Sequence, residues 1–288
     1  MTGAADTGGA ALFEYWDQFT DRYDFPDFAG APRLYVIATT PRSGSHFLGH
    51  ALWESGRFGA PLEYLHRKNF QRWQERSGAE RPRDVFDWLA RRRTSASGWF
   101  GLKLMWRQYE TWEEDGRLPF LPPVERVIHL YRRDLLGQAI SFRIAQQTGV
   151  WAAGMAGNGR EAGFDAGAIV SAAETLRRQN RAWHRTLTGP AWSDVPRLSL
   201  AYEDLAADPQ AALARVASFL APESPPELRP SARTAAQTGA RNADWRARVI
   251  AGLDRRQQWL TRPHDWSLDR RPPPRWRQRL PLGRATAF

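Results

Sequence analysis

Several kinds of residue and segment are missing from this sequence of 288 residues, and each absence removes a class of structure. It contains no cysteine, which excludes disulfide bonds and thiolate metal ligands. Its 6 histidines do not follow H-E-x-x-H or a similar metal-binding spacing, so we expect no metal. No run approaches the roughly 20 apolar residues of a membrane-spanning helix. The opening residues, MTGAADTGGAALFEYW, lack the basic and apolar regions of a secretory signal, so we expect a cytoplasmic protein.

Acidic residues are fewer than basic ones, and the formal net charge is +10. Much of the excess lies in short clusters such as 91–93 and in the last residues, RRPPPRWRQRLPLGRATAF. A basic surface suits the phosphate backbone of a nucleic acid, but it equally suits an enzyme that binds a polyanionic nucleotide. No zinc-finger, RRM or KH signature is present. We therefore expect no nucleic-acid partner. A basic nucleic-acid-binding protein is kept as an alternative function.

The pattern of apolar residues predicts an α/β fold with a mainly parallel sheet. Four strand-like segments are each followed by polar or helix-starting sequence, at 34–38, 98–106, 126–132 and 196–205. Asp134 and Asp208 have the side chains that cap helices at their N-termini, and each precedes a helical pattern. The glycine-rich segment 154–168 is interpreted as an insertion or a mobile lid.

We expect a single domain over residues 1–288. Its core covers about residues 23–260, and the segments 1–22 and 262–288 are terminal extensions.

The most informative stretch is TTPRSGSHF, at 39–47, which links the first strand to a helix. Small residues let the backbone approach a ligand closely, and the first N–H groups of a helix favour an anion. Arg42 adds a planar cation that can bind two anionic oxygens. The loop therefore suits a phosphate or sulfate group, although a bare S-G-S turn is also common as a simple polar connection.

A second basic side chain lies at the end of a later strand. Arg133 closes the third strand-like segment, and Ser141 follows eight residues later, about two helical turns along. The two side chains could converge on a further phosphate group.

Together these motifs resemble those of the nucleotide-dependent sulfotransferases, and most closely the bacterial trehalose 2-sulfotransferase family. The similar stretches are YDFPDFAGAPRLYVIATTPRSGS, GRFGAPLEYLH, FGLKLMW, RRDLLGQAISFRIAQQTGVW and YEDL. The resemblance implies a P-loop-like three-layer sandwich, in which helices flank a mainly parallel central sheet. It implies 3′-phosphoadenosine-5′-phosphosulfate (PAPS) as the donor, without a metal.

The resemblance also implies which residues bind this donor. The loop around the 5′-phosphosulfate is formed by Pro41, Arg42, Ser43, Gly44, Ser45 and His46. His46 departs from the pattern, because the family usually has a Thr or Ser hydroxyl there. Arg133 and Ser141 are implied to bind the 3′-phosphate. Arg241, in QTGARNADW, is a further candidate contact to that phosphate.

For catalysis the resemblance implies Glu63 as the base that deprotonates the sugar, with His66 in reserve. The strand position that holds histidine in animal cytosolic sulfotransferases, as K-T-H, reads Lys103-Leu104-Met105 here. Lys103 is a candidate to hold the bridging oxygen between sulfate and phosphate. Arg42 and the backbone donors of the loop would stabilise charge on the leaving phosphate without a metal.

The acceptor and the assembly are less defined. Aromatic faces suit sugars, so Trp106, Trp112 and Trp151 are candidates to line an acceptor pocket. The expected partners are PAPS or its product 3′-phosphoadenosine 5′-phosphate (PAP) and a sugar or glycolipid, either trehalose or a related glycan. The resemblance suggests a homodimer. A nucleotide-dependent phosphotransferase stays an alternative, although the loop lacks the lysine of G-x-x-x-x-G-K-[ST].

Overall fold

The computed structural model describes residues 18–152, 155–231 and 239–268. Four strands form one sheet in the order β2-β1-β3-β4. All three pairings are parallel, as the sequence predicts. The strands are β1 (Arg33–Thr39), β2 (Trp99–Met105), β3 (Val124–Tyr131) and β4 (Arg197–Ala201).

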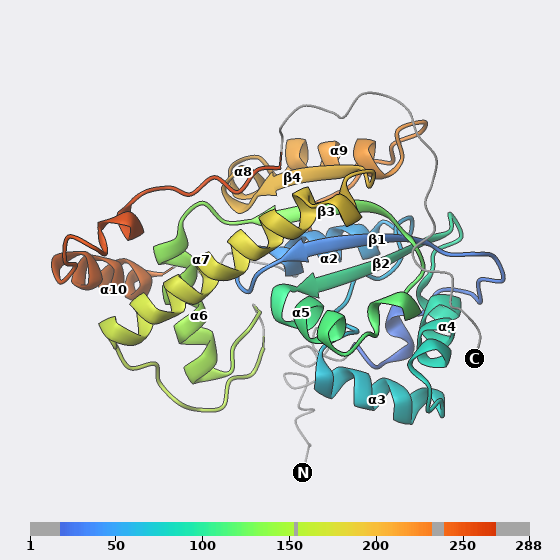
Figure 1. Cartoon of the computed structure of the whole chain (residues 1–288), viewed down its shortest axis with the longest axis horizontal. Coiled ribbons are helices and arrows are strands. Elements are labelled where there is room, and N and C mark those ends of the chain that lie inside the picture. The colour runs from blue at the N-terminus through green and yellow to red at the C-terminus, as the bar shows by residue number, and fades with distance from the viewer. Residues whose placement is uncertain (1–17, 153–154, 232–238, 269–288) are drawn as a thin grey trace, which may run out of the picture.

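Helices cover both faces of this sheet. Figure 1 shows α5 and α7 in front of the strands, with α2 behind them. The helices are α2 (Ser45–Glu54), α3 (Arg67–Ser77), α4 (Pro82–Arg93), α5 (Trp106–Glu114), α6 (Leu135–Thr148), α7 (Ala166–Thr188), α8 (Tyr202–Ala207), α9 (Pro209–Leu220) and α10 (Ala240–Ala251). Short 3₁₀ turns are η1 (Asp21–Tyr23), η2 (Leu118–Phe120), η3 (Pro190–Trp192) and η4 (Gln258–Thr261).

The alternation of side chains along β1 explains the layers. Leu34, Val36 and Ala38 point to one face and belong to a core that includes side chains of α3, α4, α5 and α7. Tyr35 and Ile37 point to the other face, into a core with side chains of α2, α8 and α9. A parallel strand with both faces covered reads as a nearly continuous apolar run, and β1 has that composition. The three-layer α/β sandwich is confirmed.

The strand order also places the loop after β1 where a ligand can bind. From β1 the chain continues to β2 on one side, and from β2 it crosses to β3 on the other side. In open parallel sheets a crevice forms at such a reversal, beyond the carboxyl ends of the strands. The segment 40–44 occupies this place, directly between β1 and α2.

Local details of the fold test the sequence-based boundaries. Asp134 caps α6 by accepting from the Gly137 N–H, and Asp208 caps α9 by accepting from the Ala211 N–H, as predicted. The last strand is shorter than the predicted 196–205, because β4 ends at Ala201 and α8 follows at once. The acidic residues in the first turn of α8 favour a helix N-terminus, which explains why the chain turns there.

Other predictions concern segments at the margins of the described residues. Residues 155–165 contain neither helix nor strand, and side-chain and backbone hydrogen bonds join them to the end of α6. Residues 1–17 of the expected N-terminal extension and residues 269–288 of the basic tail lie outside the described residues, as do Gly154, Gln237 and Thr238.

Among the helices described, none combines the length and the apolar character that crossing a membrane requires.

Candidate functional site

The loop after β1 has an unusual backbone that brings it close to the start of α2. Arg42 has a φ of 66° and Gly44 a φ of 85°, both in the left-handed region. At Gly44 a Cβ atom would lie 2.7 Å from Cδ2 of Tyr202, so a side chain there meets both strain and a clash. Gly44 is also the N-cap of α2, and it provides no side-chain cap for the helix N–H groups.

Buried polar side chains fix the shape of this loop. The Ser43 hydroxyl donates to the Thr40 carbonyl and lies 2.5 Å from the Thr39 hydroxyl. Gln138 of α6 donates from its amide to the Pro41 carbonyl, at 2.7 Å, and to the Thr40 hydroxyl, at 3.0 Å. The Ser43 side chain is therefore used inside the protein, and only its backbone can face a ligand.

Arg42 extends from the loop toward α6. Its Nε donates to the Ser141 hydroxyl at 2.9 Å, and its Nη1 donates to the Trp151 carbonyl. Burial first, and then the neighbouring Arg132, lower the pKa of Arg42 to about 10, so the guanidinium is still charged at neutral pH. The structure thus brings together two of the predicted site residues, Arg42 and Ser141.

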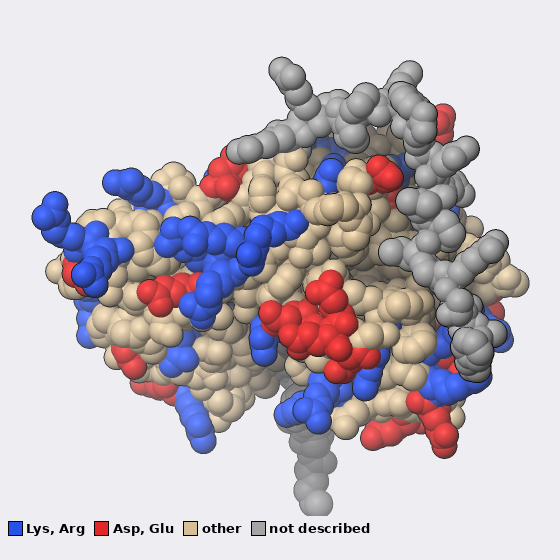
Figure 2. Space-filling model, viewed as in Figure 1, with Lys and Arg blue, Asp and Glu red and all other residues tan. Residues whose placement is uncertain are grey.

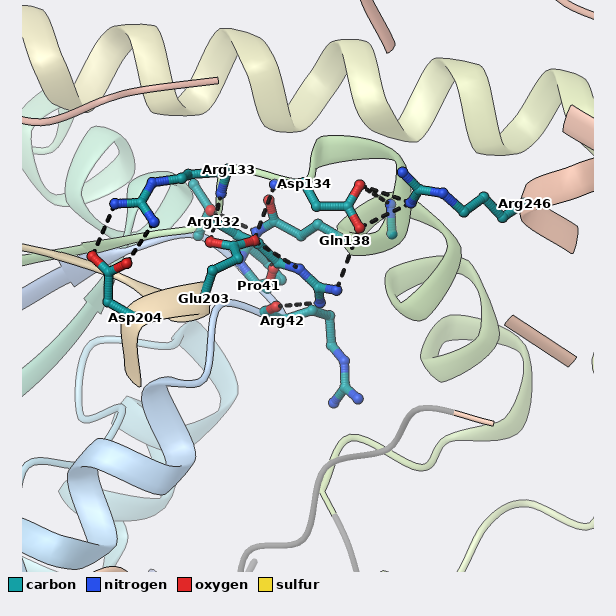
Figure 3. Close-up of polar contacts among 11 residues, drawn as sticks. Pro41, Arg42, Arg132, Arg133, Asp134, Gln138, Glu203, Asp204 and Arg246 are labelled. Carbon is teal, nitrogen blue, oxygen red and sulfur yellow. Dashed lines mark hydrogen bonds and ion pairs between the residues drawn. The ribbon is translucent and has the colours of Figure 1, made fainter. Parts of the chain in front are cut away.

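The two arginines after β3 point to different partners (Figure 3). Arg133 makes a bidentate ion pair with Asp204 of α8, at 2.6 and 2.9 Å, and its side chain extends away from that of Arg42. Arg132 lies nearer the loop, where its Nη1 approaches the Arg42 carbonyl at 3.5 Å and its guanidinium covers the Tyr202 ring. The Arg132 side chain is 12% exposed, and its Nε lies 3.8 Å from Glu203 Oε1.

Helix α10 contacts the same region through Asp134. Arg246 donates from Nη1 to both carboxylate oxygens of Asp134, each at 2.9 Å, while Asp134 keeps its cap on α6. Arg241, in the first turn of α10, is exposed. Within the described residues, the Arg241 side chain makes no hydrogen bond or ion pair with the loop.

A buried ion pair lies at the carboxyl end of β2. Lys103 Nζ is 3.1 Å from Glu63 Oε1, and the two side chains are 4% and 14% exposed. Glu63 Oε2 accepts from the Gln108 amide at 2.9 Å, so both carboxylate oxygens have a donor. Glu63 follows an isolated parallel bridge that joins Leu62 to Leu102 along β2. The carboxylate is thereby held in one orientation, whereas His66 is exposed at the N-cap of α3.

His46 joins this ion pair to the loop after β1. Its Nδ1 lies 3.3 Å from Lys103 Nζ. Burial first, and then Lys103 and His50, hold the pKa of His46 well below its usual value. The neutral ring can therefore accept from the ammonium through Nδ1, which places the ring proton on Nε2. Lys103 consequently contacts both Glu63 and the first turn of α2.

The sequence reasoning missed Arg132, Gln138 and the contact between His46 and Lys103. The sequence did point to Arg132, because two adjacent arginines precede Asp134 and either of them could bind a phosphate. Of the tryptophans predicted to line an acceptor pocket, one lies in the core. Trp112 is 3% exposed and donates to the Leu65 carbonyl in the core, so it cannot line a pocket. Among the described residues, no group of His, Asp and Glu is arranged to hold a metal ion.

The family to which this chain is similar is identified by a family model. The model of the Stf0 sulphotransferase family matches residues 34–251. A trehalose 2-sulfotransferase from Mycobacterium tuberculosis is 27% identical over 273 residues, which is 78% of this chain and 97% of the relative. A second trehalose 2-sulfotransferase, from Mycolicibacterium smegmatis, is 27% identical over 207 residues, or 54% of this chain and 73% of the relative. The sulfotransferase domain of the Synechococcus PCC 7002 olefin synthase superposes with a TM-score of 0.41 and 16% identity, covering 80% of this chain and 99% of that domain.

Proposed function

Because this chain belongs to the Stf0 sulphotransferase family, we propose that it transfers a sulfuryl group from PAPS to a hydroxyl of a carbohydrate, trehalose or a related glycan or glycolipid. The observation that carries the proposal is the position of Lys103. One buried ammonium contacts both the Glu63 carboxylate and His46, in the first turn after the anion-binding loop. These contacts support the proposal, because they bring the proposed base and a cation next to the proposed anion-binding loop.

In this proposal the residues around the loop hold the donor. The N–H groups at the start of α2 and the Arg42 guanidinium bind the 5′-phosphosulfate. Ser141 and Arg133 bind the 3′-phosphate, with Arg241 as a further contact. The side chains of Arg133 and Asp204 are 36% and 41% exposed, and ion pairs as exposed as this one contribute roughly 0–1 kcal/mol. A phosphate can therefore take the place of Asp204 at small cost.

Glu63 and Lys103 perform the transfer itself. Glu63 removes the proton from the acceptor hydroxyl as its oxygen attacks sulfur in line with the leaving group. A new S–O bond forms to the sugar, and the S–O bond to the phosphate breaks, which releases PAP. Lys103 and Arg42 stabilise the charge that develops on the bridging oxygen. The acceptor proton ends on Glu63.

The donor assignment is tested by thermal shift with PAP and with ATP plus Mg²⁺. A ligand at 100 times its dissociation constant stabilises the folded state by roughly 2.7 kcal/mol. We expect PAP to raise the melting temperature at concentrations where ATP does not. A larger shift with ATP and Mg²⁺ would instead favour the phosphotransferase alternative. A panel of sugars with labelled PAPS then identifies the acceptor.

The base is tested with Glu63→Gln, which keeps the side-chain shape and removes the proton acceptor. We expect kcat to fall by roughly 10²–10⁴-fold with PAP affinity unchanged. Glu75→Gln, an exposed carboxylate on α3, is the matched control and should keep wild-type activity. If Glu63→Gln keeps more than about a tenth of kcat, the assignment is wrong and His66 becomes the candidate.

The homodimer, the cytoplasmic location and the single-domain organisation remain predictions from the sequence. Light scattering tests the first of these. A particle of 32.8 kDa at micromolar concentration would contradict a stable dimer.

A further inference from the structure

A large groove lies on the face of the molecule that carries α5 and α7, apart from the donor loop. Its volume is about 980 Å³, and its walls come from α5, α7 and the segment after η4. None of the residues proposed to bind the donor lines it. Figure 2 shows basic side chains along α7 beside a group of acidic side chains over α5.

The α7 wall has a cation-rich surface. Arg178, Arg181 and Arg185 line the groove and are exposed. Their spacing of three and four residues places them on one side of the helix. Within the part of the chain that the structure describes, neither Arg181 nor Arg185 has an ion-pair partner, and Arg178 donates only to the Thr175 hydroxyl. Three neighbouring cations that make no ion pair with a described residue favour a bound anion.

The opposite walls have different chemistry. Trp106 and Trp266 supply aromatic surface, and Glu110 and Asp265 supply carboxylates. Glu110 Oε1 accepts from the Trp106 indole at 3.2 Å, and its Oε2 pairs with Arg107, which also lines the groove. Hydrogen bonds from the Ser267 backbone N–H and then from the Tyr131 hydroxyl hold the pKa of Asp265 below its usual value, so this carboxylate is charged at neutral pH. Carboxylates repel a dense polyanion such as a nucleic-acid backbone but accept hydrogen bonds from hydroxyl groups.

Two polar atoms of the lining residues, the amide oxygen Oε1 of Gln179 and Trp266 Nε1, are buried without a hydrogen-bond partner in the described part of the chain. A buried acceptor left unpaired costs about 1–3 kcal/mol. A rotation of this amide toward a ligand hydroxyl would satisfy it.

From these walls we propose that the groove is a second ligand site, which binds a saccharide bearing a tetrahedral oxyanion, either a sulfate or a phosphate ester. The arginines of α7 bind the anionic group. The carboxylates and Gln179 bind ring hydroxyls, and the indoles cover the apolar faces of the sugar. This site goes beyond the proposed transfer reaction, because it needs neither the donor loop nor the base, and it includes Trp106, a candidate for the acceptor pocket.

The test measures binding of a fluorescently labelled disaccharide that carries one sulfate, with PAP added to occupy the donor loop. We compare the wild type with Arg181→Ala/Arg185→Ala. The control is Arg81→Ala/Arg83→Ala, which removes the same charge from exposed positions at the start of α4. We expect affinity to fall at least tenfold in the groove variant and to stay within twofold in the control. Equal losses in both variants would overturn the proposal, since they would indicate only general charge attraction.

Further arms of the experiment identify the ligand. The unsulfated disaccharide should bind at least tenfold more weakly than the sulfated one. Inorganic sulfate that binds as tightly as the sulfated disaccharide would overturn the saccharide part of the proposal. The affinity for the phosphorylated disaccharide is compared with that for the sulfated one, and the tighter of the two identifies the ester that the groove prefers. Equal affinities support a site that recognises the tetrahedral oxyanion of either ester. Because binding is the only readout, the comparison of the groove variant with its control does not require that the protein transfers a sulfuryl group.

Discussion

His129 makes the stability of this protein sensitive to acid. The side chain is fully buried in β3, and among the described residues neither ring nitrogen has a hydrogen-bond partner. Burial first, and then the nearby His184, lower the pKa of His129 from 6.5 to about 3. Between about pH 6.5 and pH 3, the His129 ring therefore carries a proton in the unfolded chain and is neutral in the folded chain. Stability is lost as the pH falls through that window.

The size of the effect follows from the shift. Each pKa unit corresponds to about 1.4 kcal/mol, so 1.5 units below the unfolded value, at pH 5, the loss is about 2 kcal/mol. It increases to about 5 kcal/mol near pH 3, where the folded protein also takes up the proton.

The perturbation is His129→Leu, an apolar residue of similar volume that cannot titrate. We measure the free energy of unfolding by urea denaturation at pH 7.5 and pH 5.0, for both proteins. The wild type should lose about 2 kcal/mol more than the variant between the two pH values. Other groups, His46 included, titrate in both proteins and cancel in the comparison. Parallel losses in the two proteins would refute the reasoning, because they would show that His129 does not titrate between the folded and unfolded states as described.

Two further predictions concern the proposed donor site. Gly44→Ala should lower the free energy of unfolding by more than about 1 kcal/mol and weaken PAP binding in calorimetry, because strain adds to a clash with α8. Gly56→Ala is the control, because Gly56 has a similar positive φ of 68° but a Cβ there would have no neighbour within 4 Å. This substitution should lower the free energy of unfolding and leave PAP affinity intact. Equal losses of PAP affinity in both variants would contradict the role of the loop. Arg133→Ala should reduce PAP affinity at least tenfold, since a charged hydrogen bond contributes about 1.5–3 kcal/mol. Arg229→Ala, an exposed arginine paired with a nearby glutamate, is its control, and unchanged affinity in a folded Arg133 variant would remove that residue from the site.

Features set by neighbouring residues could be predicted from the sequence. The strand, small-residue loop and helix around Arg42 depend on apolar spacing and on Gly44, all within about twenty residues. Asp134 and Asp208 cap their helices because an aspartate oxygen reaches an N–H three residues later. The parallel sheet followed from strand segments that alternate with helical ones.

The residues that face one another at the site were decided by tertiary structure. Lys103 meets His46 across 57 positions of sequence, and no local pattern encodes that contact. Whether Arg132 or Arg133 lies nearer the loop depends on where α8 places its two acidic residues. The burial of Trp112 likewise depends on the packing of α5 in the core. Local sequence determines which elements form, because capping and periodicity act over a few residues, whereas the packing of distant elements determines which side chains meet.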